Sequence, residues 1–205
     1  MKNKLIIVAG CSGSGKSTVS SKIKQSFGEK KAQIICMDRF YKVNASKMPK
    51  VKKTGHANYD HPNSFDWVLL RKCLRSLLND KPTKVPVYDY TIHSRKKELE
   101  LIKPTRIIIF EGFLALYDKV FNDMAELKVY VDTSLEKCFR RRLQRDKKQR
   151  KRTEKSIRIQ WNESVVPMFN KYVKPNIKVA DFLLPWERKN TKSLNYLIAA
   201  IKAKM

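Results

Sequence analysis

The residues best suited to chemistry lie near the start of the chain, in a run of glycines and small hydroxyl residues. The run reads Gly10-Cys11-Ser12-Gly13-Ser14-Gly15-Lys16-Ser17-Thr18 and follows the apolar run 5–9. Glycines let the backbone N–H groups turn toward an anion, and a helix starting near Lys16 adds its positive N-terminal end. Lys16 can reach the outer phosphates, and the Ser17 hydroxyl can ligate Mg²⁺. The pattern predicts a nucleoside triphosphate site; a Gly/Ser-rich turn before an ordinary helix is the alternative.

Two acids follow apolar, strand-like runs further along the chain. Asp38 comes directly after the run 33–37, and Glu111 comes directly after the run 106–110. Because the carboxyl ends of parallel strands meet at one edge of a sheet, both carboxylates are expected beside the phosphate loop. A Mg²⁺–triphosphate complex needs hard oxygen ligands there, and a hydroxyl nucleophile needs a proton acceptor. With Ser17 the two acids predict a magnesium site; two helix-capping acids are the alternative.

A dense basic segment occupies residues 140–152 and is too charged to form a core helix. On a helix, Arg142 and Arg145 share a face at i, i+3, and Arg150 and Arg152 are further candidates. Cationic side chains stabilise the negative oxygens of a phosphoryl-transfer transition state, and a lid of this type excludes water. The alternative is a solvated basic helix.

The three histidines, His56, His61 and His93, have no metal-ligand spacing. His93 shares an aromatic, polar stretch with Tyr88 and Tyr90. Near a site that needs an acceptor substrate, a role in contacting a planar base is reasonable for it. A surface histidine is the alternative.

Apolar runs alternate with helix-like segments along most of the chain. The strand-like runs are 4–9, 33–37, 106–110, 127–131 and 182–184, and the helix-like segments are 16–27, 64–78, 134–148, 153–173 and 191–203. This alternation predicts an α/β fold of the P-loop NTPase type, a doubly wound parallel sheet of about five strands with helices on both faces. We expect Asn63 or Ser64 to cap the helix of 64–78, and Thr133 or Ser134 to cap the helix of 134–148.

Two polar stretches interrupt the alternation. Residues 39–63 form a long loop, and residues 82–103 resemble an inserted β-hairpin. Long excursions in a compact α/β domain are usually functional. We therefore expect a single domain over 1–205, with a hairpin at about 82–103 and a basic helical lid at about 138–156.

The formal charge of the 205-residue chain is +26, from 45 lysines and arginines against 19 acids. Such a balance often marks a nucleic-acid partner, but these residues are spread along the chain, and a Lys-rich composition bias is the plainer interpretation. The four dispersed cysteines are typical of reduced thiols. No apolar run approaches the roughly 20 residues that span a bilayer, and no secretory signal precedes the first strand. We expect a cytoplasmic protein with neither a specific nucleic-acid partner nor a membrane partner.

Several motifs, in order along almost the whole chain, resemble those of the uridine–cytidine kinase family. After the glycine-rich run come MDRFYK, NYDHPNSFD, VPVYDYTIHSR, IIIFEGFLAL, VYVDTSLEKCFRRRLQRD and VPMFNKYVKPNIKVADFLLP. The pair of NYDHPNSFD and YDYTIHSR is the most specific part. Phosphoribulokinase and pantothenate kinase share the loop and the general plan, but both segments are not expected in them.

The resemblance implies roles in phosphoryl transfer. Asp38 is the base that takes the proton of a nucleoside 5′-hydroxyl. The phosphates are held by Lys16, Arg142 and Arg145. The residues serving Mg²⁺ are Ser17 and Glu111, with Asp38 nearby.

It also implies roles in holding the nucleoside. Asp60 hydrogen-bonds the ribose hydroxyls, helped by Arg152 and Gln160. The polar edge of the pyrimidine is read by Tyr88 and His93. The residues packing around the base are Tyr59, Tyr90 and Phe113. Family members are homotetrameric and are inhibited by pyrimidine triphosphates, so a homo-oligomer is expected.

Three positions depart from the family pattern. Lys151 replaces the glycine of an Arg-Gly-Arg sequence, so the lid would take another path if that glycine supplied an unusual backbone angle. Arg39 replaces a serine and is expected to add a cation beside Asp38. The segment 185–190 lacks the expected glycines.

These observations predict a pyrimidine-salvage kinase that uses ATP, or GTP, and Mg²⁺ to phosphorylate uridine and cytidine to UMP and CMP. The alternatives are another small P-loop kinase acting on a different hydroxyl, and a basic RNA-binding NTPase or non-catalytic nucleotide sensor.

Overall fold

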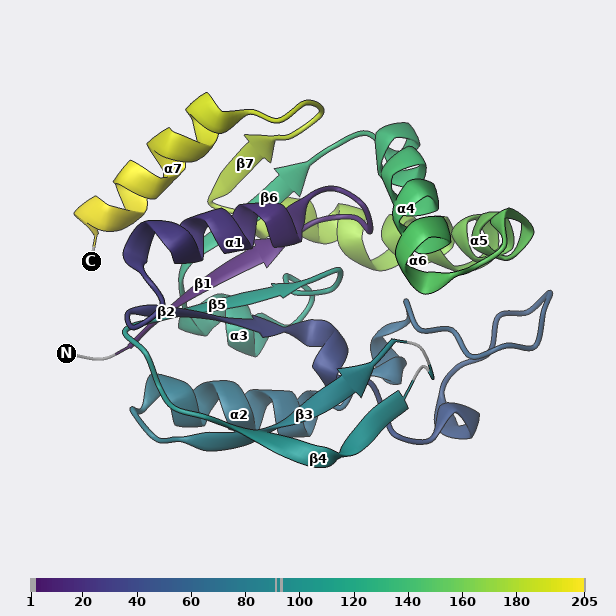
Figure 1. Ribbon diagram of the computed structural model, residues 1–205, viewed down its shortest axis with the longest axis horizontal. Coiled ribbons are helices and arrows are strands. Elements are labelled where there is room, and N and C mark those ends of the chain that lie inside the picture. Colours follow the sequence, from purple (N-terminus) through teal and green to yellow (C-terminus); the bar gives the residue numbers. More distant parts are fainter. Residues whose placement is uncertain (1–2, 91, 93, 205) are drawn as a thin grey trace.

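A five-stranded parallel sheet forms the centre of the protein (Figure 1). The computed structural model describes residues 3–90, 92 and 94–204. The strands are β1 (Lys4–Ala9), β2 (Ala32–Cys36), β5 (Ile107–Gly112), β6 (Ala125–Asp132) and β7 (Phe182–Pro185). Their order is β2-β5-β1-β6-β7, and every neighbouring pair is parallel. The α/β architecture predicted from the sequence is confirmed.

Helices cover both faces of the sheet because its central strands are apolar on both sides. In β1, Leu5 and Ile7 belong to one core, whereas Ile6 and Val8 belong to the other. The second core is covered by α1 (Lys16–Phe27) and α7 (Thr191–Ala203). The first is covered by α2 (Trp67–Leu78), α3 (Lys119–Met124) and the segment 161–173, whose buried side chains belong to it. Figure 1 shows α1 and α7 on one face of the sheet and α2 and α3 on the other. Period-2 alternation across a buried strand therefore places the sheet between two helical layers.

A separate antiparallel hairpin lies beside α2 and consists of β3 (Thr83–Asp89) and β4 (Ser94–Ile102). It contacts η1 (Met37–Phe40), the 3₁₀ turn that follows β2. The long excursion after η1 contains two further 3₁₀ turns, η2 (Ala45–Lys47) and η3 (Pro62–Ser64). The hairpin therefore packs against the turn from which the long excursion starts.

A helical arm follows β6. It begins with α4 (Leu135–Arg150), which Ser134 caps by accepting a hydrogen bond from the Lys137 N–H. It continues through α5 (Glu154–Gln160), the π-helical η4 (Trp161–Val165), α6 (Val166–Met168), the π-helical η5 (Phe169–Val173) and the 3₁₀ segment η6 (Lys174–Val179). The helical segment expected over 153–173 therefore forms from Glu154 onward, but two π-helical turns interrupt its α-helical pattern, and Pro167, which has no backbone N–H, lies between them.

Two local expectations were wrong or incomplete. Asp66, rather than Asn63 or Ser64, caps α2, and its carboxylate accepts the Leu69 N–H at 3.0 Å. Ser64 lies in η3, where its hydroxyl donates instead to the Asn58 carbonyl. Helix α3 is short and was not predicted. Within the described residues, no helix is long and apolar enough to cross a bilayer.

Candidate active site

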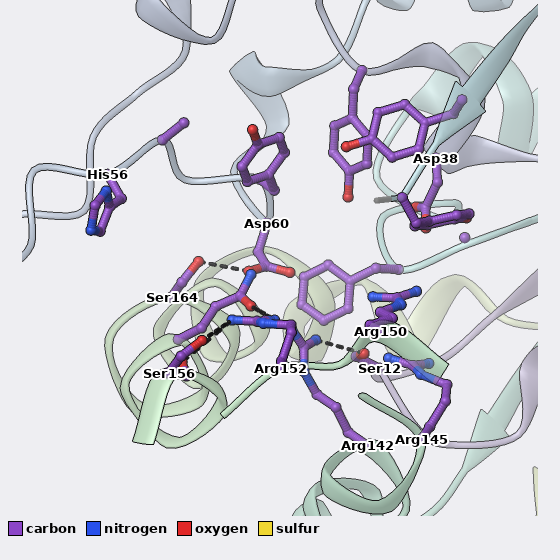
Figure 2. A pocket seen from close by; sticks show the side chains of 18 of the residues that line it. Ser12, Asp38, His56, Asp60, Arg142, Arg145, Arg150, Arg152, Ser156 and Ser164 are labelled. Atoms are coloured by element: carbon purple, nitrogen blue, oxygen red, sulfur yellow. Dashed lines mark hydrogen bonds between the residues drawn. The ribbon is translucent and has the colours of Figure 1, made fainter. Parts of the chain in front are cut away.

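A cavity of about 410 Å³ opens beyond the carboxyl ends of β1, β2 and β5 (Figure 2). Ligands bind in this position in open α/β sheets. The wall nearest the sheet comes from the glycine-rich loop after β1, from η1 and from the end of β5. The opposite wall comes from α4, α5, η4 and residues of the 39–63 excursion. The elements that carry the predicted chemistry therefore converge on one space.

The glycine-rich loop has a backbone that only glycine fits. Gly13 and Gly15 have φ angles of 87° and 102°. A Cβ on Gly13 would lie 2.2 Å from the Cys138 carbonyl oxygen, and one on Gly15 would lie 2.5 Å from the Trp186 ring. Helix α1 begins directly afterwards at Lys16, so the loop has the left-handed turns and helix start of an anion cradle.

The loop residues predicted to bind a nucleotide divide into three groups. Those that line the cavity are Ser12, Lys16 and Ser17. Those that form the turn behind it are Gly10, Gly13, Ser14 and Gly15. Thr18 lies exposed on the first turn of α1 and is not part of the cavity lining.

The three residues predicted to serve a metal ion all line the cavity. The Ser17 hydroxyl donates to Glu111 Oε1 at 3.1 Å, while Glu111 Oε2 is buried without a hydrogen-bond partner among the described residues. Burial raises the pKa of Glu111, although the positive charge of Lys16 opposes the shift. A divalent cation bound to a triphosphate would satisfy this orphaned oxygen, so the donor set fits Mg²⁺.

No group of three or more His, Cys, Asp or Glu side chains suited to a metal ion occurs in the described ranges. Mg²⁺ needs no such cage, because it commonly keeps waters and phosphate oxygens as ligands. Asp38 lies in η1, where its Oδ2 accepts a 3.0 Å hydrogen bond from the Tyr90 hydroxyl.

Four arginines of the lid face one carboxylate, which the sequence analysis did not single out. Asp146 is fully buried, and its oxygens lie 2.8 Å from Arg145 and 3.5–3.7 Å from Arg142, Arg150 and Arg152. Burial opposes ionisation of Asp146, but Arg145 and Arg142 outweigh it and hold the pKa of the carboxyl below its usual value. One acid therefore gathers four cations at the cavity wall and leaves the cluster strongly positive.

Two of these arginines also join neighbouring parts of the site. Arg142 donates to the Ser12 hydroxyl at 2.7 Å and to Gln160 Oε1 at 2.7 Å. Arg152 donates to the same Gln160 oxygen at 2.6 Å and to the Ser156 hydroxyl at 2.9 Å (Figure 2). The lid is thus connected to the phosphate loop through Arg142 and Ser12.

Asp60 lies at the far end of the cavity, in a cluster of polar side chains. Its Oδ2 accepts a 2.6 Å hydrogen bond from the Ser164 hydroxyl of η4. Its backbone N–H donates to Asn58 Oδ1 at 3.1 Å. Burial raises the pKa of Asp60, and the charge of Arg142 counteracts this shift. Sequence reasoning missed Ser164 because a lone serine on a helix carries no recognisable signal.

Aromatic rings line the space between Asp60 and Asp38. Tyr41 contacts both Tyr59 and Tyr88, with ring centroids 5.3 Å and 5.1 Å apart, and Tyr88 contacts Tyr90 at 5.1 Å. The predicted base-packing residues Tyr59, Tyr90 and Phe113 all line the cavity, and so does Tyr88, which was predicted to read the polar edge of the base. Tyr41 joins them, and its place three residues after Asp38 was the available signal. His93 lies outside the described residues.

Two of the departures from the family sequence pattern, at Arg39 and Lys151, have a structural explanation. Arg39 does not point at Asp38 as expected; its Nε donates to the Pro86 carbonyl at 2.6 Å, and its Nη2 donates to Glu100 at 2.6 Å. It therefore fastens η1 to the hairpin. Lys151 adopts the left-handed conformation itself, with φ 51°, so the chain turns at the end of α4 without glycine. The unusual backbone angle considered for the replaced glycine is therefore adopted here by lysine.

Comparison with known proteins gives a consistent relationship along the whole chain. The model of the Phosphoribulokinase / Uridine kinase family matches residues 5–193. The chain is 37% identical to a uridine kinase of Ureaplasma urealyticum over 94% of this chain and 93% of that protein. It is 38% identical to a uridine kinase of Mycoplasma genitalium over 98% and 93%, respectively. Phosphoribulokinase of Rhodobacter spheroides has a similar fold, with a TM-score of 0.65 at 16% identity over 88% of this chain and 68% of that one.

Proposed function

The chain belongs to the phosphoribulokinase/uridine kinase family of P-loop kinases, and on that premise we propose that it phosphorylates uridine and cytidine at the 5′-hydroxyl. ATP, or GTP, donates the γ-phosphoryl group, and the products are UMP or CMP and the nucleoside diphosphate. The names of the relatives support uridine as an acceptor. Pyrimidine salvage is the corresponding role.

The observation that carries this proposal is that one cavity joins a phosphate loop to an aromatic pocket with a buried carboxylate. Lys16 and the lid arginines line this cavity together with Asp60 and the tyrosines, and Asp60 lies close enough to Arg142 and Arg152 for their charges to act on its pKa. Aromatic rings with a few polar groups suit a planar heterocycle. An ionised carboxylate only accepts hydrogen bonds, so Asp60 suits the adjacent hydroxyl donors of a ribose.

Asp38 also lines the cavity and is the proposed base. As the nucleoside O5′–phosphorus bond forms, the 5′-hydroxyl proton passes to the Asp38 carboxylate, and the bond from the γ-phosphorus to the bridging oxygen breaks. Lys16, Arg142 and Arg145 would stabilise the negative charge on the transferred group. Ser17 and Glu111, with Asp38 nearby, would hold Mg²⁺, which would supply positive charge to neutralise the phosphates of the donor.

The lid arginines would also meet a second requirement of phosphoryl transfer, which is the exclusion of water from the cavity. Arg142, Arg150 and Arg152 line the cavity opposite the sheet. Water would otherwise compete with the nucleoside as phosphoryl acceptor. Cytoplasmic location remains a prediction from the composition of the chain, and a homotetramer and inhibition by pyrimidine triphosphates remain predictions from the family resemblance.

The test is a coupled assay of nucleoside diphosphate release across an acceptor panel. Uridine, cytidine, adenosine, pantothenate and ribulose 5-phosphate are each supplied with ATP and then with GTP. We expect rapid turnover with uridine or cytidine and slow turnover with the other acceptors.

Two outcomes would contradict the proposal. Faster turnover with pantothenate or ribulose 5-phosphate would identify a kinase for a different hydroxyl. Hydrolysis that RNA stimulates and no nucleoside accelerates would identify an RNA-dependent NTPase instead.

A further inference from the structure

We propose that Ser164 is a positioning residue that holds the Asp60 carboxylate in the orientation a ribose requires, and so sets how strongly the site rejects 2′-deoxynucleosides. This inference rests on the proposed function and deepens it, because it names the residue that fixes the sugar-reading carboxylate. Ser164 makes no proposed contact with the substrate and acts through Asp60.

The geometry around the Ser164 hydroxyl is compact. Its Oγ lies 2.6 Å from Asp60 Oδ2 and 2.7 Å from Asn58 Oδ1, as the close-up in Figure 2 shows for Asp60. Asn58 Oδ1 already accepts the Asp60 backbone N–H at 3.1 Å. One hydroxyl carries a single proton, so the two oxygens compete for it. A carboxylate is the stronger acceptor, and O–H···O⁻ bonds are typically as short as about 2.5–2.7 Å.

The position of Ser164 in the helical arm is otherwise that of a core residue. Trp161, Ser164 and Val165 are the buried side chains of η4, and Ser164 is 1% exposed. A buried hydroxyl needs a hydrogen-bond partner, so packing alone would favour an apolar side chain there. The π-helical turn changes the direction in which its side chains point relative to those of α5. Such turns are frequent at functional sites. Asp60 and Asn58 therefore account for the serine, and packing does not.

A neighbouring contact joins the same two segments but is less suited to positioning Asp60. Glu163 forms a 3.0 Å ion pair with Lys53, whose side chain is 76% exposed. Exposed ion pairs contribute little, because water screens them and ordering long side chains costs entropy. The buried Ser164 contacts are the ones that can fix the carboxylate.

Loss of the Ser164 hydroxyl would leave Asp60 buried without its donor. Among the residues that the structure describes, the charged groups that act on it include Arg142, Arg152 and Asp38. The carboxylate would then be free to turn toward the arginines or to take up a proton, and either change removes an acceptor for the ribose hydroxyls. A hydrogen bond to a charged group corresponds to an effect of roughly 10–100-fold. A 2′-deoxynucleoside, which makes fewer hydrogen bonds to Asp60, should lose less.

The experiment measures kcat and KM for uridine and 2′-deoxyuridine, and KM for ATP, in the wild type and four variants. They are Ser164→Ala, Ser164→Thr, Asp60→Ala and the double variant Asp60→Ala/Ser164→Ala. Ser76→Ala is the matched control, because it makes the same change on α2, outside the cavity lining.

We expect Ser164→Ala to lower kcat/KM for uridine by about 10–100-fold, mainly by raising KM. The ratio of kcat/KM for uridine to kcat/KM for 2′-deoxyuridine should therefore fall. KM for ATP should stay within about twofold, and Ser164→Thr should restore most of the ratio. The double variant should resemble Asp60→Ala, because residues that act through one another are non-additive. Ser76→Ala should match the wild type.

Two outcomes would overturn the inference. These are a uridine to 2′-deoxyuridine ratio of kcat/KM that is unchanged in Ser164→Ala, because both nucleosides lose equally or not at all, and full additivity in the double variant. A wild-type protein that phosphorylates no pyrimidine ribonucleoside would overturn the proposed function first and this inference with it, and that result is visible before any variant is compared.

Discussion

The hydroxyl of Tyr90 donates a 3.0 Å hydrogen bond to Oδ2 of Asp38. The guanidinium of Arg150 lies over the Tyr90 ring, 4.6 Å from its centroid. Burial and the negative charge of Asp38 raise the pKa of Tyr90, so the phenol keeps its proton and remains a donor. Tyr90 thus connects the end of the hairpin to the proposed base on one side and to the lid on the other.

Replacing Tyr90 with phenylalanine should therefore disturb catalysis more than binding. The ring would keep its contact with Arg150, but Asp38 would lose the donor that fixes its rotamer. A carboxylate accepts several hydrogen bonds, so the nucleoside hydroxyl does not need the oxygen that Tyr90 uses. We expect kcat to fall about tenfold with KM for uridine within about threefold. Steady-state kinetics would check this, with the exposed Tyr196→Phe as control; a tenfold rise in KM and an unchanged kcat would contradict it.

Asp38→Asn should remove the proposed base while keeping its shape. Loss of a general base typically lowers turnover by ~10²–10⁴-fold. ATP affinity should change much less, because Lys16, the glycine-rich loop and the lid arginines stay in place. Turnover in the coupled assay and nucleotide affinity by titration calorimetry are the two measurements. Near-normal turnover in the variant would remove Asp38 from the mechanism.

The parts of the fold that follow from local patterns were predictable. The strand β1 could be identified because Leu5 to Ala9 form a continuous apolar run before a glycine-rich loop. The same loop predicted the start of α1, since Lys16 follows its last glycine. The placement of Asp38 and Glu111 beside the glycine-rich loop could be predicted because the carboxyl ends of parallel strands lie at the same edge of a sheet.

Contacts that depend on tertiary packing were not predictable. Asp146 looks like one acid within a basic helix, and nothing local shows that four arginines turn toward it. Ser164 reaches Asp60 across 104 positions of sequence. The direction of Arg39 depends on Glu100, which lies on a hairpin strand far along the chain. Lysine disfavours the left-handed backbone conformation, but Lys151 adopts it because it is the residue that ends α4.

Lys151→Gly should stabilise the protein. A non-glycine residue in the left-handed conformation costs about 1–2 kcal/mol, and glycine offsets part of that gain through its greater freedom in the unfolded chain. We expect a net gain of about 0.5–1 kcal/mol in the free energy of unfolding by urea. Lys151→Ala is the matched control, since it removes the same charge but keeps the backbone cost. Equal stability of the two variants would show that charge, and not backbone conformation, is responsible.

Asp146→Asn should make the lid unstable in a pH-dependent way. Removing the charge leaves four arginines facing a neutral amide, and breaking a buried ion pair costs about 3–5 kcal/mol. The pKa of Asp146 lies below its usual value in the folded protein, so its contribution is fully present above the unfolded pKa of about 3.9 and is lost as the pH falls through the folded pKa. The difference in stability between wild type and variant should therefore hold from pH 7 to about pH 4.5 and shrink below it.

Thermal unfolding of both proteins from pH 7 to pH 3 would measure this difference. Asp123→Asn is the control, because Asp123 forms an exposed ion pair with Lys119 and should contribute less than about 1 kcal/mol at any pH. The Asp146→Asn variant should also be a slower enzyme. At pH 7 its kcat should fall, because Arg142 and Arg145 lose the carboxylate that orients them toward the cavity. A stability difference that stays constant down to pH 3 would mean that the Asp146 charge does not hold the arginines together, and that its shape and hydrogen bonds are sufficient.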